Sequence, residues 1–150
     1  MSETPEPYKI QLDLPSRLEL LGVVDRLADG ITEHMEFEDT DKDAVAISVI
    51  EACTNAIQHG HHAEAGRMVR LCFELQRDTL VITVHDEGEG FDLGTLSDVA
   101  PPDLLATRGR GIYIMRSMMD EVAFDFSDGT LVRLAKHRSK RDGGENAEES

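Results

Sequence analysis

Glu51 and Asn55 are the residues whose types and surroundings most clearly suggest chemistry in this chain. They are four positions apart in the segment 44–57, which contains no Gly, no Pro and no other charged residue. A helix places residues i and i+4 on one face, and burying an unpartnered carboxylate costs several kcal/mol. Glu51 must therefore face water, a ligand or a partner. On spacing alone, a solvated edge of a core helix is the simpler explanation.

Two glycine-containing segments further along the chain could accommodate a ligand. Asp86 follows the apolar run 80–84 and precedes Gly88 and Gly90, and glycines let the backbone approach a ligand closely. The segment 108–111, with the sequence R-G-R-G, precedes an amphipathic stretch and is predicted to start a helix. Free N–H groups and the helix dipole at such a start favour phosphate. Each segment alone is weak evidence, since both patterns also occur in ordinary turns.

The helix that carries Glu51 is predicted to be mostly covered, with Gly60 near its end. At about 100° per residue, one stripe collects apolar side chains and the opposite side collects polar ones. The predicted buried stripe is Ala46, Val49, Ile50, Cys53 and Ile57, and the polar side is Ser48, Glu51 and Asn55. Ser16 with Glu19, and Thr40 with Asp43, are predicted capping pairs at the starts of the first two helices.

Alternating apolar residues predict a strand at 10–14, a hairpin of strands at 69–76 and 80–84, and a closing hairpin at 122–126 and 130–135. The segment 92–107 lacks a period and contains Pro101 and Pro102, so we expect a long loop that acts as a lid. A third amphipathic helix follows from residue 112. This order predicts an α+β fold, a two-layer sandwich with a mixed, mainly antiparallel sheet and helices on one face. We expect one domain at 10–136, with disordered ends at 1–9 and 137–150.

The composition limits the classes of function. The net charge of −15 argues against nucleic acid or an anionic membrane surface as the main partner. No run approaches the ~20 apolar residues of a membrane span, and the acidic start resembles no signal peptide. We therefore expect a cytoplasmic protein. Cys53 and Cys72 lack metal-ligand spacing and are interpreted as buried apolar residues. His59, His61 and His62 fit a polar helix end better than a metal site.

The three motifs together resemble those of the anti-sigma-factor serine/threonine kinases, within the superfamily of histidine kinases, gyrase-type ATPases, chaperone ATPases and mismatch-repair ATPases. The resemblance covers residues 10 to 136, and the order and spacing of the motifs match as well as the letters. The matching segments are E-A-C-T-N-A-I-Q-H-G at 51–60, D-E-G-E-G-F-D at 86–92, R-G-R-G-I-Y-I-M-R-S-M-M-D-E-V at 108–122 and G-T-L-V-R-L at 129–134.

The resemblance implies a Bergerat-type ATP-binding fold with the ATP pocket between helices and sheet. By matching position, Glu51 is the general base that deprotonates a substrate hydroxyl, and Asn55 holds Mg²⁺ against the phosphates. Asp86 accepts a hydrogen bond from the adenine amino group, with Thr130 in support. The remaining implied nucleotide contacts are Gly88 and Gly90 under the base, and Arg108, Gly109, Arg110 and Gly111 at the phosphates.

The resemblance also implies an activity and partners. The expected activity is serine/threonine protein kinase, using Mg²⁺ and ATP to phosphorylate an anti-anti-sigma (STAS) type antagonist. The expected partners also include a sequestered sigma factor and a second copy in a homodimer. Two alternatives stay open: a nucleotide-dependent sequestering protein without essential kinase activity, and a kinase whose regulated target is not a sigma factor. Histidine kinase activity is disfavoured, because the 40 residues before the matched helix leave no room for a phosphoacceptor helical hairpin.

Overall fold

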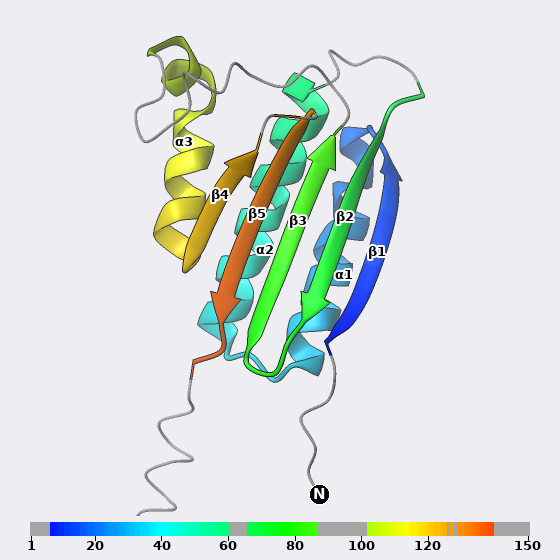
Figure 1. Ribbon diagram of the computed structural model, residues 1–150, viewed down its shortest axis with the longest axis vertical. Helices are drawn as coiled ribbons and strands as arrows, with labels where there is room; N and C mark the ends of the chain where they lie inside the picture. Colours follow the sequence, from blue (N-terminus) through cyan, green and yellow to red (C-terminus); the bar gives the residue numbers. More distant parts are fainter. Residues whose placement is uncertain (1–6, 61–65, 87–101, 126, 128, 140–150) are drawn as a thin grey trace, which may run out of the picture.

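The structure is a computed structural model that describes residues 7–60, 66–86, 102–125, 127 and 129–139; the side chains of residues 59, 60 and 102–109 lie outside this description. Five strands and three α-helices form two layers (Figure 1). The strands are β1 (Tyr8–Pro15), β2 (Met68–Leu75), β3 (Thr79–Asp86), β4 (Glu121–Asp125) and β5 (Thr130–His137). The helices are the 3₁₀ turn η1 (Leu18–Leu20), α1 (Leu21–His34), α2 (Asp39–Asn55), the π-helical turn η2 (Ala56–Gly60) and α3 (Pro102–Met118).

The sheet has the strand order β1-β2-β3-β5-β4, and each neighbouring pair is antiparallel. The three helices lie on one face of this sheet (Figure 1). Both predicted hairpins are present, and the apolar run at 80–84 lies in β3, the middle strand. The α+β class and the two-layer arrangement predicted from the sequence are confirmed.

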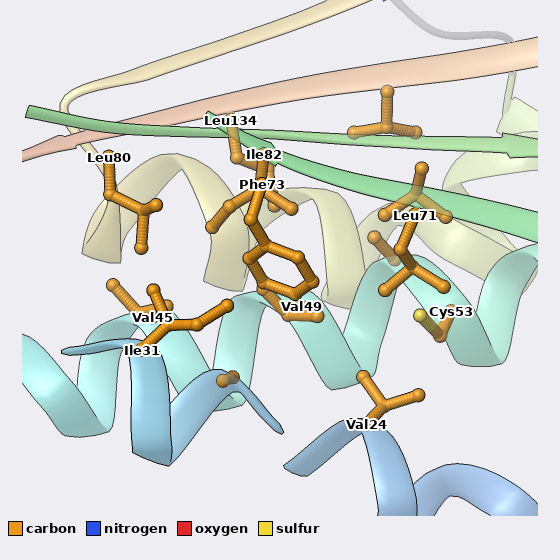
Figure 2. Packing of buried hydrophobic residues seen from close by; sticks show 14 of the residues in the cluster. Val24, Ile31, Val45, Val49, Cys53, Leu71, Phe73, Leu80, Ile82 and Leu134 are labelled. Atoms are coloured by element: carbon orange, nitrogen blue, oxygen red, sulfur yellow. The ribbon is translucent and has the colours of Figure 1, made fainter. Parts of the chain in front are cut away.

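The core lies between the sheet and the helices, and buried residues of both α1 and α2 contribute to it (Figure 2). Phe73 of β2 is fully buried and points toward Val49 of α2. Cys53, one turn further along α2, is fully buried as predicted, whereas Cys72 is half-buried. Burying one such apolar side chain contributes about 1.5–3 kcal/mol, so α2 is held by packing along most of its length.

The buried face of α2 is wider than the predicted stripe. Ser48 was expected beside Glu51 on the polar side, but it is fully buried, and its Oγ has no hydrogen-bond partner. Ile50 is only partly buried, and its neighbour Ile47 is 41% exposed. The prediction was wrong here because a helix in contact with a sheet and two other helices buries far more than one stripe.

The helix starts also differ from the predictions. The residues at the N-caps of α1 and α2 are Leu20 and Glu38, and neither side chain makes a capping hydrogen bond. Both predicted capping pairs were therefore wrong. A 3₁₀ turn precedes α1. The helix α2 begins at Asp39, and the acidic residues of its first turn interact favourably with the helix dipole although no side chain caps the helix.

The predicted lid at 92–107 is wrong over its last six residues, which belong to α3. Residues 92–101 lie outside the described residues. Pro102 is the first residue of α3, a position that suits proline because its missing N–H has no helical partner there. The residues that follow, D-L-L-A, are helical although their apolar positions show no clear helical periodicity.

Both ends of the folded domain extend beyond the predicted bounds. Tyr8 already pairs with β2 as the first residue of β1. At the other end, His137 closes β5, and the Ser139 N–H donates to Asp41 Oδ2 at 3.1 Å. The Lys136 ammonium donates to the Met118 carbonyl at 2.8 Å and lies 3.8 Å from Asp41. Lys136 thus joins the end of α3 to the start of α2. Residues 1–6 and 140–150 lie outside the described residues.

Candidate active site

Glu51 and Asn55 lie on the side of α2 that faces α3, and both side chains are partly buried. Gly111 of α3 comes so close that a Cβ there would lie 2.6 Å from Glu51 Oε2 and 3.4 Å from Asn55 Nδ2. A non-bonded contact of 2.6 Å is far below normal van der Waals separation. The backbone of α3 at a glycine therefore forms one wall against the carboxylate and the amide.

Asp86 and Thr130 form a second group. Asp86 is the last residue of β3 and is 1% exposed, and Thr130 is the first residue of β5 and is 8% exposed. The two residues are directly opposite each other in the antiparallel register. A carboxylate this deeply buried needs hydrogen-bond donors, and Asp86 does take part in interactions within the structure. Asp86 and Thr130, which were predicted to act together, therefore lie beside each other in the sheet, and their role in binding adenine stays a prediction.

The two groups lie at the same end of the domain. The C-terminal end of α2, the end of β3 and the start of β5 meet there, opposite the β2–β3 hairpin (Figure 1). The turn η2, which follows Asn55 directly, contacts β3. Short π-helical turns are frequent at functional sites, and η2 is a feature that the sequence analysis missed, because no residue pattern distinguishes it from a helix end.

The segment 108–111 is placed differently from the prediction. It was expected to start a helix and offer free N–H groups, but it lies in the interior of α3, which begins at Pro102. The N–H groups of an interior helical segment bond to carbonyls one turn earlier. Arg110 is exposed and Gly111 is buried. Gly111 is thus brought to the site, but through its contact with Glu51 rather than through a free N–H group.

Several predicted site features fall outside what the structure describes. These are Gly88 and Gly90, the surroundings of Arg108 and Gly109, and the side chains of the three histidines at 59, 61 and 62. Among the described residues, no group of three or more His, Cys, Asp or Glu side chains could hold a metal ion. A metal bound beside Asn55 would therefore need ligands beyond the described side chains, and the phosphates of a nucleotide with water are suitable ones.

Comparison with known proteins agrees with this geometry. Residues 14–136 match the model of the histidine kinase-like ATPase domain. The chain belongs to this family. It is 33% identical over 144 residues to the serine-protein kinase RsbW of Bacillus licheniformis, covering 90% of both chains. It is 30% identical over 135 residues to RsbW of Bacillus subtilis, covering 85% of this chain and 84% of that protein. The resemblance to anti-sigma-factor kinases stated from the motifs is confirmed.

Solved structures support the family fold. The RsbU and RsbW domains of a Mycobacterium tuberculosis protein match with a TM-score of 0.68 at 13% identity, over 89% of this chain and 33% of that one. The histidine kinase domain of a blue-light-activated kinase from Erythrobacter litoralis matches with a TM-score of 0.55 at 19% identity, over 83% of this chain and 61% of that one. Within the described part of this histidine kinase-like domain, no helix is long and apolar enough to cross a membrane.

Proposed function

We propose that this protein is an ATP-dependent serine/threonine kinase of a partner-switching system. The observation that carries the proposal is the placement of Glu51 and Asn55 against the glycine backbone of α3, at the same end of the domain as the buried Asp86. The relatives named serine-protein kinase RsbW support the reaction class. The proposed substrate is an anti-anti-sigma (STAS) type protein, and the proposed sequestered partner is a sigma factor.

In this proposal, Glu51 is the catalytic base. Its partly buried carboxylate would accept a hydrogen bond from the substrate Ser or Thr hydroxyl, orient its oxygen and take its proton during transfer. Phosphoryl transfer requires mainly positioning and charge stabilisation from the protein. The backbone of α3 at Gly111 lies close to the Glu51 carboxylate and would prevent it from moving toward α3.

The residues present fit Mg²⁺ and ATP. The Asn55 side chain supplies a neutral amide oxygen, a hard ligand of the kind that Mg²⁺ takes alongside phosphates and water. Bound Mg²⁺ would neutralise charge on the phosphates. Asp86, buried opposite Thr130, would accept a hydrogen bond from the adenine amino group. Contacts of phosphates with the N–H groups of Gly109 and Gly111 would require α3 to open locally, and each interior glycine lowers helix stability by about 1 kcal/mol.

A homodimer is part of the proposal. Leu18 of η1 and Val23 of α1 are 45% and 49% exposed. Large exposed apolar patches mark interaction sites, whereas single exposed apolar residues are normal. In this proposal, Leu18 and Val23 belong to the apolar surface of the first helical segment that a second copy would cover.

The test is phosphoryl transfer to candidate antagonist proteins encoded in neighbouring genes. Each candidate is incubated with the protein and Mg²⁺-ATP, and its mass is measured. We expect one added phosphate on a Ser or Thr, lost with Glu51→Ala. Arg133→Met, on the opposite face of the sheet, is the control and should transfer normally. Measurable ATP binding without transfer to any candidate would instead support a sequestering protein that needs no kinase activity.

A further inference from the structure

A hollow lies at the end of the domain opposite the candidate active site. It has a volume of about 310 Å³ and is formed where the end of α1, the β2–β3 turn and the start of β1 meet. Its lining residues are Tyr8, His34, Met35, Glu36, Leu75, Gln76, Arg77 and Arg138. Small-molecule sites begin at roughly this size. Nothing in the proposed kinase reaction uses this hollow.

Glu36 stands in the hollow in a conformation that suits glycine. Its φ is 63°, in the left-handed region. A residue other than glycine is destabilised in this region, and residues strained in this way are often found at functional sites. The position closes α1, with the Glu36 N–H bonding to the Glu33 carbonyl at 2.9 Å and the Phe37 N–H bonding to the Thr32 carbonyl at 3.0 Å. This is the helix-ending motif in which glycine is usual. A carboxylate here therefore calls for an explanation other than local backbone preference.

Two arginines, Arg77 and Arg138, line the same hollow. Arg138 donates through Nη1 to the Met35 carbonyl at 3.3 Å and through Nη2 to Asp78 Oδ1 at 2.9 Å. These bonds fix the Arg138 side chain and use two of the five N–H donors of a guanidinium. Arg77 has no ion pair or side-chain hydrogen bond among the described residues, and neither has Glu36. Glu36 and Arg77 thus border one space without an ion pair of their own, beside Arg138, which is paired with Asp78.

We propose that this hollow binds a free α-amino acid with an apolar side chain. Glu36 would receive the ligand's ammonium group, and Arg77 with Arg138 would receive its carboxylate, a geometry that guanidinium groups suit well. Tyr8, Met35 and Leu75 provide an apolar wall for the side chain. A simple anion would leave Glu36 repelling it, and a simple amine would be repelled by the arginines. The combination of charges selects a zwitterion.

The test uses L-leucine and two analogues that each lack one charge. 4-Methylpentanoate lacks the ammonium group, and 3-methylbutylamine lacks the carboxylate. Each is titrated into the full ¹⁵N-labelled chain, and amide shifts are followed by NMR. We expect saturable shifts at Tyr8, Glu36 and Arg77 with leucine, and none at Glu51 or Asp86. Both analogues should bind severalfold more weakly, because each lacks one of the two charged groups for which the exposed Glu36 and Arg77 would provide partners.

Two variants make the test independent of folding. Glu36→Gly should unfold at the same or a higher urea concentration than the parent, since glycine tolerates the left-handed φ. In this variant leucine should bind no better than 4-methylpentanoate. Arg77→Ala should abolish the preference for leucine over 3-methylbutylamine, whereas Arg116→Ala, which changes an exposed arginine of α3 outside the hollow, should change nothing.

Three outcomes would overturn the proposal. The first is the absence of saturable shifts with leucine, methionine or phenylalanine up to about 20 mM. The second is 4-methylpentanoate binding as tightly as leucine, which would mean a simple anion site. The third is unchanged leucine binding in a folded Glu36→Gly variant.

Discussion

Replacing Gly111 by Ala should separate catalysis from stability in this protein. The added Cβ would lie 2.6 Å from Glu51 Oε2 and 3.5 Å from Glu51 Cδ. Ordinary contact begins near 3.4 Å, so the carboxylate has to move by roughly 0.8 Å. Because this atom is the far end of a flexible side chain, the side chain should move rather than the helices.

The expected size of each effect follows from this geometry. Displacing a catalytic group by about 1 Å costs on the order of 100-fold in rate. Against this, Ala in place of Gly in a helix interior gains about 0.5–1 kcal/mol. We therefore expect Gly111→Ala to transfer phosphate about 100-fold more slowly while the free energy of unfolding stays within about 1 kcal/mol of the parent.

The assay measures both quantities with a matched control. Transfer rates are measured on the acceptor protein found by mass spectrometry, and the free energy of unfolding is measured by urea denaturation. Gly30→Ala is the control, because Gly30 lies in α1 and its Cβ would meet nothing within 4 Å. It should gain stability, raising Tm by about 2–4 °C, and keep the full transfer rate. A transfer rate for Gly111→Ala within about twofold of the parent would refute the proposed restriction of Glu51 by α3.

Three further predictions concern buried polar groups. Ser48→Ala should raise the free energy of unfolding by about 1 kcal/mol in urea denaturation, because Ser48 Oγ is buried without a hydrogen bond; a clear loss would show that the hydroxyl has a partner. Lys136→Met should lower it by about 3 kcal/mol, because Lys136 and Asp41 are only 15% and 10% exposed, whereas the exposed Arg133→Met should cost less than about 1 kcal/mol; equal losses would contradict this. Burial raises the pKa of Cys53 from 9.0 to about 12, so its stabilising contribution is complete below pH 9 and is lost as pH rises toward 12. Between pH 8 and pH 10.5 the parent should therefore lose about 2 kcal/mol more than Cys53→Ala in the same denaturation series, and parallel losses would contradict the raised pKa.

The sequence alone determined the strands and the class of fold. Alternation in β1, β2 and β5 is the direct consequence of a sheet with one buried face, and the apolar run of β3 correctly predicted a central strand. The isolated charge of Glu51 in an apolar helix and the glycines that follow Asp86 pointed to the candidate site by residue type. These signals depend only on residues near each other in the chain, so the periodicity and composition of short segments are enough to detect them.

Only the tertiary structure decided how the helices meet and what their contacts do. Ser48 is buried because α2 packs against α1, α3 and two strands of the sheet, which a single helix taken alone does not reveal. Gly111 lies beside Glu51, which is 60 residues away in the chain, and local sequence contains no information on such a proximity. Likewise, Glu36, with its left-handed backbone, lines the same hollow as Arg77 and Arg138 because a helix end, a turn and the end of a strand converge there. Residue types and periodicity specify elements, whereas the packing of those elements specifies which residues become neighbours.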